Sequence, residues 1–189
     1  GQRIGGYDDL REYLGKSRSQ PVEGETSYQP VLAIFGVAFM LALAISWYVF
    51  ETVLTVQAAE WFVSLSMALL AIQKLQDLRS FSTMFLNYDL LARRWVRYGY
   101  IYPFGEALAG ILMVAHVLPI ISVPVSLFIG TVGAVSVFKA VYVDKRELKC
   151  ACVGGNSNVP LGFVSLTENL FMIGMGLWMG AKALGLVAV

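Results

Sequence analysis

Charged side chains are scarce in this chain. Only 14% of its 189 residues are Asp, Glu, Lys or Arg, whereas soluble domains carry about 25%. The missing charges leave long uncharged runs, which are typical of membrane-spanning helices. The net charge of +1 gives no electrostatic reason to expect a nucleic-acid partner. The composition therefore predicts an all-α integral membrane protein with the lipid bilayer as its surroundings.

Cysteine and histidine are scarcer still, with two Cys and one His. Two cysteines cannot form a disulfide framework, so they must be judged by their position. The single histidine, His116, has no second histidine with which to share a metal ion, and a polar contact is the expected role. The sequence also contains no phosphate-binding loop, Ser-His-Asp arrangement or paired zinc-ligand motif. Hydrolase and nucleotide chemistry therefore have no support.

Five apolar segments are long enough to cross a hydrocarbon core of roughly 30 Å as helices that rise 1.5 Å per residue. We expect these spans at residues 31–50, 53–72, 101–118, 124–143 and 163–189. The second span extends toward Lys74, whose stem can reach toward the interface. Pro119 and Pro124 are expected to bracket a turn between the third and fourth spans.

Two other segments differ from the spans. Residues 1–28 are polar and mixed in charge, so we expect a separate segment there and a transmembrane bundle over residues 29–189. Between residues 78 and 97, apolar side chains recur at helical spacing among several arginines. This pattern predicts an amphipathic helix at the membrane surface.

Basic residues are distributed unevenly around the five spans. One side would hold the N-terminal segment and the loops after the second and fourth spans, and the opposite loops carry no Lys or Arg. The basic residues on the first side are Arg3, Arg11, Lys16, Arg18, Lys74, Arg79, Arg93, Arg94, Arg97, Lys145, Arg146 and Lys149. Because cytoplasmic loops carry the excess of Lys and Arg, we expect the N-terminus and the loop 144–162 in the cytoplasm, with the chain in a bacterial inner membrane.

Cys150 and Cys152 lie one residue apart in the loop 144–162, near basic residues that favour the reactive thiolate. A Cys-x-Cys pair closes a disulfide only in a small, strained ring, and strained disulfides exchange readily. The same two thiolates can instead chelate a soft metal ion. A third interpretation is that both are small apolar residues without a chemical role. The sequence alone leaves these three alternatives open.

Ionisable residues inside the spans are candidates for function, because a charge in the bilayer is costly. Glu168 lies early in the fifth span and Glu106 early in the third, where Lys74 could be its counter-ion. We expect Lys74, Glu106 and Glu168 to supply charge or proton control. Met172 and Met175 share a helix face with Glu168. That face could add metal ligands to Cys150 and Cys152; alternatively, the methionines pack the bundle and Glu168 pairs with Lys74 or an arginine.

Several short motifs occur together in one known family. They are Lys74-Leu75-Gln76-Asp77 with Phe81, Asn87-Tyr88-Asp89-Leu90-Leu91-Ala92, Tyr102-Pro103-Phe104-Gly105-Glu106, Cys150-Ala151-Cys152-Val153-Gly154 and Glu168-Asn169. This combination, over about residues 55–180, resembles the MauE/DoxX group of redox-associated membrane proteins, although Ala151 stands where MauE usually has glycine. The resemblance implies a four-helix core, to which the span 31–50 would be an addition. It also implies thiol–disulfide exchange in the maturation of disulfide-containing periplasmic proteins.

A second resemblance concerns residues 4–15, Ile-Gly-Gly-Tyr-Asp-Asp-Leu-Arg-Glu-Tyr-Leu-Gly. This stretch resembles the C-terminal end of a glutaredoxin, and Gly6 and Asp9 would then help to hold the γ-glutamyl end of glutathione. The catalytic cysteine and cis-proline segments of a glutaredoxin are missing, so we expect the stretch to be the remnant of a glutaredoxin–membrane fusion.

Three functional hypotheses follow. In the first, the protein is a membrane thiol–disulfide oxidoreductase in which Cys150 and Cys152 exchange electrons with glutaredoxin- or thioredoxin-type proteins, with glutathione as a possible cofactor of such a partner. In the second, it binds or transports a soft metal ion, of copper or mercury type, through Cys150, Cys152, Glu168, Met172 and Met175. In the third, it is a structural partner whose cysteines are incidental. The sequence has no second cysteine pair to relay electrons to the opposite side of the membrane, which favours the second hypothesis, whereas the glutaredoxin-like stretch favours the first.

Overall fold

The computed structural model describes residues 28–146, 148, 150–151 and 159–187, and this part of the chain is all-α. Its elements are α2 (Gln29–Phe50), α3 (Val56–Gln76), α4 (Leu78–Phe85), α5 (Val96–Val114), α6 (Pro119–Phe138), the π-helix η1 (Lys139–Val143) and α7 (Phe163–Ala183). The five long helices correspond to the five predicted spans, with ends that shift by a few residues. The expected all-α membrane fold is confirmed.

Three of these helices are long and apolar enough to cross a membrane by length and composition: α2, α3 and α6 together with η1. The helices α5 and α7 have 19 and 21 residues. Each carries two charged residues, Arg97 and Glu106 in α5 and Glu168 and Lys182 in α7, as does α3 with Glu60 and Lys74. The polar sites described below join these three helices.

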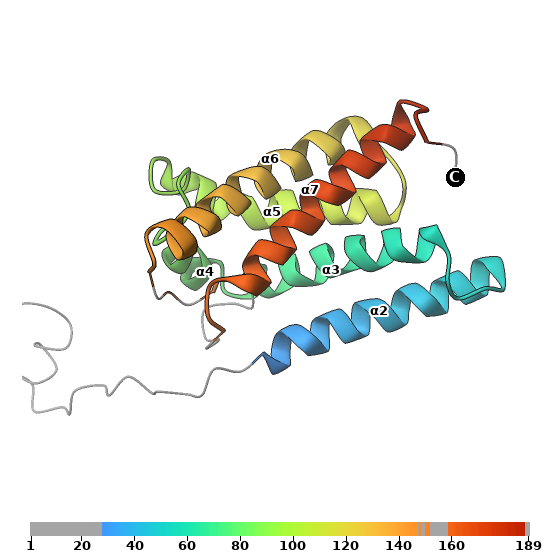
Figure 1. Cartoon of the computed structure of the whole chain (residues 1–189), viewed down its shortest axis with the longest axis horizontal. Helices are drawn as coiled ribbons and strands as arrows, with labels where there is room; N and C mark the ends of the chain where they lie inside the picture. Colours follow the sequence, from blue (N-terminus) through green and yellow to red (C-terminus); the bar gives the residue numbers. More distant parts are fainter. Residues whose placement is uncertain (1–27, 147, 149, 152–158, 188–189) are drawn as a thin grey trace, which may run out of the picture.

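The helices α3, α5, α6 and α7 form a bundle, and α2 lies along the outer side of α3 (Figure 1). The side of α2 that is buried carries mostly small residues, including Ala38, Ala42 and Ser46, while Phe39, Met40 and Trp47 stay exposed. A four-helix core with one added N-terminal helix was the expected arrangement. The small buried residues let α2 approach α3 closely, and the rings of Phe35 and Phe39 pack beside them against Phe62 of α3.

Hydrogen bonds of Ser46 and Thr55 hold the short connection between α2 and α3. Glu51 ends α2 in the left-handed conformation, with φ of 56°. The hydroxyl of Thr55 then accepts the backbone N–H of Ala58 at 2.9 Å, which caps the first turn of α3. Ser46 donates to the carbonyl of Thr52 at 2.9 Å and contacts the Thr55 hydroxyl at 2.8 Å. These bonds satisfy backbone groups that a helix end otherwise leaves without partners.

Glycine permits the closest helix contacts in the bundle. A Cβ atom added at Gly110 of α5 would lie 3.0 Å from the backbone nitrogen of Ala68 and 3.1 Å from the carbonyl oxygen of Ser64, both in α3. At Gly133 of α6, an added Cβ would lie 2.1 Å from the Asn169 side chain of α7. At Gly110 the α3–α5 pair is therefore packed backbone to backbone, and at Gly133 the α6–α7 pair is packed backbone to side chain, both without room for a methyl group.

Two details differ from the predictions. The amphipathic helix expected over residues 78–97 is present only as α4, because the chain turns at residues 86–95 before α5 begins. Its apolar residues Phe81 and Phe85 are buried against Tyr102 of α5 and do not face lipid. The turn expected between Pro119 and Pro124 is also absent, since Pro119 begins α6 and Pro124 lies inside that helix. Proline fits the first turn of a helix because its missing N–H has no acceptor there.

The close contact at Gly110 can be tested by substitution. We expect Gly110→Val to lower the stability of the folded bundle by about 1–3 kcal/mol, because the added atoms meet the α3 backbone, which cannot turn away. Thermal unfolding in detergent measures the change. Gly36→Val is the matched control, since a Cβ there meets nothing within 4 Å. Equal unfolding temperatures for the two variants would contradict this account of the α3–α5 contact.

Candidate functional site

A buried ion cluster joins three helices of the bundle. The ammonium nitrogen of Lys74, in the last turn of α3, lies 2.8 and 2.6 Å from the two carboxylate oxygens of Glu106 in α5. The same nitrogen donates to Oε1 of Glu168 in α7. All three side chains are at most 4% exposed. Both expected pairings, Lys74 with Glu106 and with Glu168, are observed; the stem of Lys74 turns inward and does not reach for the interface.

The composition of this cluster gives it capacity for a proton. Two carboxylates face one ammonium, so the formal charge is −1 when all three are ionised and zero when one carboxylate is protonated. Burial penalises the charged forms unless they are paired and hydrogen-bonded. The ring of Tyr102 lies over the ammonium, with its centroid 5.4 Å away. The cluster is therefore electrically balanced with one carboxylate protonated, and it carries one uncompensated negative charge when both are ionised.

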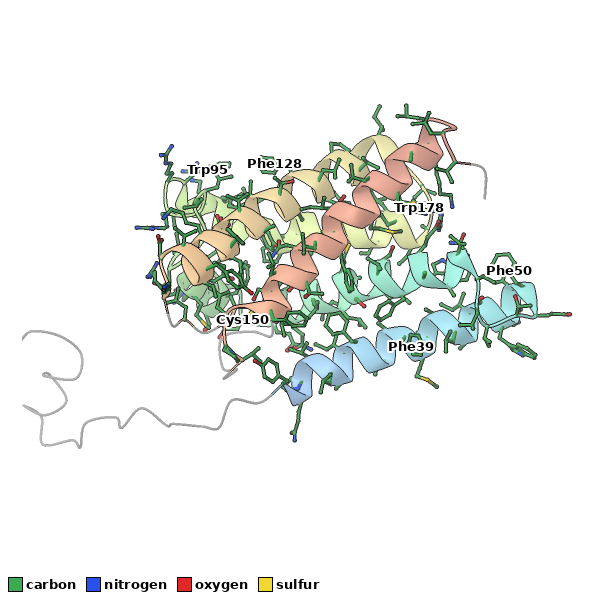
Figure 2. All side chains as sticks on the ribbon, viewed as in Figure 1. Phe39, Phe50, Trp95, Phe128, Cys150 and Trp178 are labelled. Carbon is green, nitrogen blue, oxygen red and sulfur yellow. The ribbon has the colours of Figure 1, made fainter. Side chains whose placement is uncertain are left out.

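Cys150 lies against the first turn of α7. Its side chain is fully buried, and its sulfur lies 2.9 Å from the hydroxyl oxygen of Ser165. Its backbone N–H donates to the carbonyl of Val159, and that of Leu161 donates to the carbonyl of Leu148, both at 2.7 Å. These two bonds hold the described ends of the cysteine loop side by side. Figure 2 shows Cys150 beside the start of α7, at the same end of the bundle as α4.

A small cavity lies between Ser165 and the ion cluster. Ser165 and Glu168 are three residues apart on α7 and therefore lie on one helix face. Both line a cavity of about 10 Å³, together with Lys74, Tyr88 and Asn169 among others. That volume holds about one water molecule. Ser165 thus contacts Cys150 and shares a cavity with Glu168.

Tyr88 is a member of this site that the functional analysis of the sequence did not single out. It lies in the turn after α4, and its hydroxyl lies against the backbone N–H of Ala151, between the two cysteines in the sequence. Burial raises the pKa of Tyr88 above its usual range, and the nearby carboxylates of Glu168 and Asp89 raise it further. The phenol is therefore held protonated. In the sequence, the only signal for a role of Tyr88 is its place in the motif that begins at Asn87 and resembles the MauE/DoxX group.

Asp89 holds this turn in place. One carboxylate oxygen accepts the backbone N–H groups of Leu91 and Ala92, at 3.0 and 2.8 Å. Burial raises the pKa of Asp89, while these N–H groups oppose the rise. Arg146, at the start of the cysteine loop, donates to the carbonyl of Asn87 at 2.8 Å. The turn after α4 and the loop before Cys150 are therefore tied together.

The two methionines predicted as soft ligands do not gather at the cysteine. Both are buried, Met172 completely and Met175 to 6% exposed. Along α7, Met175 lies ten residues beyond Ser165, a rise of about 15 Å. Met172 packs against Gly130 of α6. This is the packing role considered for the methionines, and within the described residues no three His, Cys, Asp or Glu side chains are grouped to hold a metal ion.

A second polar cluster surrounds Glu60 at the other end of α3. Its Oε1 accepts from Trp178 Nε1 at 2.6 Å and from Lys182 Nζ at 2.8 Å. His116 lies 3.3 Å from Oε2 and also contacts Gln57, which agrees with the polar contact expected for that histidine. This role of Glu60 was not predicted from the sequence.

Methionines separate the two clusters. Glu60 and Lys74 are fourteen residues apart on α3, about 21 Å. Met67 stands halfway between them, and Met113 of α5 and Met172 of α7 occupy the corresponding stretches of their helices. All three are at most 2% exposed and belong to the apolar core. Three further predicted site residues, Cys152, Gly6 and Asp9, lie outside the residues that the structure describes.

Removing the central ammonium should destabilise the bundle. We expect Lys74→Met to cost about 3–5 kcal/mol, because two buried carboxylates are then left without a cation. Adding Glu106→Gln and Glu168→Gln to that variant should restore most of the loss. Thermal unfolding in detergent measures each step. If Lys74→Met unfolds at the temperature of the unaltered protein, the cluster does not stabilise the fold.

The fold and this site can be compared with known proteins. The family model described as "Methylamine utilisation protein MauE" matches residues 51–182. The match begins at the end of α2 and reaches the last turn of α7, so it includes the ion cluster and Cys150. No curated protein and no solved structure matches, and the glutaredoxin-like stretch 4–15 lies outside the matched residues and stays a prediction. Because the match covers more than half of the chain, this membrane protein belongs to the MauE family.

Proposed function

We propose that the protein is a membrane thiol–disulfide redox protein in which Cys150 and Cys152 cycle between dithiol and disulfide at the cytoplasmic face. The observation that supports this most directly is the position of Cys150. Its sulfur is buried and lies 2.9 Å from Ser165, which lines the same small cavity as Glu168 and Lys74. A purely structural cysteine needs no such neighbours.

The burial of Cys150 suggests different tasks for the two thiols. In the oxidising direction, the Cys152 thiolate attacks a disulfide of glutathione or of a thioredoxin-type protein, and one thiolate leaves. The Cys150 thiolate then attacks the Cys152 sulfur of this mixed disulfide, forms the Cys150–Cys152 bond and expels the second thiolate. The two cysteines lose two electrons and two protons, and the partner's disulfide gains two electrons. The reverse sequence reduces the pair.

The second step needs a base for the Cys150 proton. Ser165 is close enough to accept that proton while passing its own hydroxyl proton toward the cavity, where the carboxylate of Glu168 lies. Lys74 and Glu106 balance the charge as Glu168 changes state. Tyr88 supports the same step by fixing the backbone of Ala151. In this proposal, the charge and proton control expected for Lys74, Glu106 and Glu168 serves the deprotonation of Cys150.

The distribution of basic residues supports a cytoplasmic position for the cysteine loop, and the family supports a redox partner protein. A cytoplasmic loop would meet glutaredoxin- or thioredoxin-type proteins, in agreement with the glutaredoxin-like stretch. The MauE family is described by methylamine utilisation, and the resemblance implies help in maturing disulfide-containing proteins. The soft-metal alternative is less favoured, because Glu168 is already bound to Lys74 and Met175 lies well beyond the cysteine along α7.

The redox proposal predicts a reversible disulfide. We expect the purified protein to lose two alkylatable thiols on oxidation and to regain them in reducing glutathione buffer. Alkylation followed by mass spectrometry of the intact chain measures both forms, and Cys150→Ser with Cys152→Ser is the control. A pair that remains reduced at all biological potentials, or that holds a stoichiometric metal ion through its thiols, would contradict the proposal.

The proton role of Glu168 can be separated from its structural role. We expect Glu168→Gln to slow the closure of the mixed disulfide by about 10²-fold, the usual contribution of a general base. Glu106→Gln is the matched control, because it leaves the same net charge around Lys74 but removes a carboxylate that does not line the cavity with Ser165. Rapid acid quenching and mass spectrometry follow the reaction. Equal slowing in both variants would argue that only the cluster's stability matters.

A further inference from the structure

We propose that the start of α5 is a binding site for an anionic phospholipid. The phosphate of the lipid lies among the guanidinium groups of Arg93, Arg94 and Arg97, and one acyl chain follows the outer face of α5. Cys150 is not part of this surface, so the proposal does not depend on thiol chemistry.

Three arginines gather where the chain enters α5. Arg93 and Arg94 lie in the turn before the helix, and Arg97 lies in its first turn. The turn is compact, because the N–H groups of Arg93 and Arg94 donate to the carbonyls of Asp89 and Leu91, at 3.1 and 3.0 Å. All three arginines are exposed, and within the part of the chain that the structure describes none of them has an ion pair or a side-chain hydrogen bond. Their long side chains can therefore converge on one phosphate.

The protein itself supplies no exposed carboxylate to balance these charges. From α4 to η1 the acidic residues are Asp89 and Glu106, and both are 0% exposed. On either side of this stretch, Asp77 caps α4 and Asp144 pairs with Lys139. The first turn of α5 also has no acidic residue and no side-chain cap, although the positive end of a helix dipole favours negative charge. An anion from outside the chain satisfies the arginines and this helix end together.

An apolar stripe continues from Arg97 along the outer face of α5. Ile101, Phe104, Leu108 and Ile111 follow Arg97 at helical spacing and share its face. These four residues are 46–61% exposed, and on the outside of a membrane bundle they face lipid chains. From Arg97 to Leu108 the helix rises about 16 Å, close to half of a hydrocarbon core of roughly 30 Å. The stripe therefore matches one acyl chain whose headgroup lies at Arg97.

Trp95 favours a membrane lipid over an acidic protein as the source of the anion. It lies among the three arginines, is 50% exposed, and is followed by Val96 at 53%. Figure 2 shows it at the start of α5, at the end of the bundle where Cys150 also lies. Tryptophan is enriched at membrane–water interfaces, where its ring lies at headgroup level. An acidic protein would match only the arginines, whereas an anionic lipid covers both the arginines and the apolar stripe.

The test measures lipid binding to the full chain in detergent by native mass spectrometry. The probes are phosphatidylglycerol and phosphatidylcholine with identical acyl chains, and we expect the unaltered protein to prefer phosphatidylglycerol. The combined variant Arg93→Gln, Arg94→Gln and Arg97→Gln should lower this preference about 100-fold, because each basic residue near an anionic surface contributes a factor of about five. Thermal unfolding checks that this variant folds, and Arg97→Gln alone, with an expected loss of about fivefold, replaces it if it does not.

The matched control removes the same charge elsewhere. Arg3→Gln, Arg11→Gln and Arg18→Gln, in the segment before α2, should leave the preference unchanged, as should Cys150→Ser. Equal losses in the two triple variants, or no preference in the unaltered protein, would mean that the arginines before α5 form no lipid site.

The source of the anion is identified by competition. Glycerol 3-phosphate and inorganic phosphate at the concentration of the lipid should not displace phosphatidylglycerol, since they lack the chain that packs on α5. A polyglutamate peptide should not displace it either. Displacement by the small phosphates would indicate a site for free anions, and displacement by the peptide would indicate a surface for an acidic protein; either result overturns the proposal.

Discussion

One ammonium group held between two carboxylates determines how this bundle is assembled. In an apolar interior Lys74 cannot be left without its partners, and each carboxylate needs the same cation. The last turn of α3, the middle of α5 and the beginning of α7 must therefore meet at one point. The hydrophobic effect cannot impose such a meeting inside a bilayer, because lipid chains are as apolar as the helices. Close packing through glycine brings the helices together, and the ion cluster fixes their register.

The position of the cysteine follows from that register. Once Glu168 is bound to Lys74, the first turn of α7 is placed with Ser165 facing the loop, and Cys150 packs on Ser165. The turn after α4 closes the other side, because Asp89 shapes it and Arg146 ties it to the loop. The segment around Cys150 is thus supported by residues from several parts of the chain, as a defined local geometry requires.

The sequence predicted the long helices and both partners of Lys74, because uncharged runs and isolated intramembrane charges are local signals. It did not predict Ser165, Tyr88 or the bonds among Glu60, Trp178 and Lys182. Those contacts depend on the rotation and register of helices far apart in the chain, and a serine or tryptophan in an apolar run has no distinguishing pattern. The break in the helix expected after residue 78 was missed for a related reason: Asp89 bonds the backbone of Leu91 and Ala92, and helical periodicity alone does not reveal this.

The buried methionines bear on how the two polar clusters influence each other. Met67, Met113 and Met172 carry no ionisable group and are buried. Along α3, the interval between Glu60 and Lys74 holds no ionisable side chain, and the hydroxyls of Ser64 and Ser66 within it are bonded to carbonyls of the same helix. The charges of the two clusters are therefore held about 21 Å apart along α3, and a change at one of them has no charged side chain of that helix through which to act on the other.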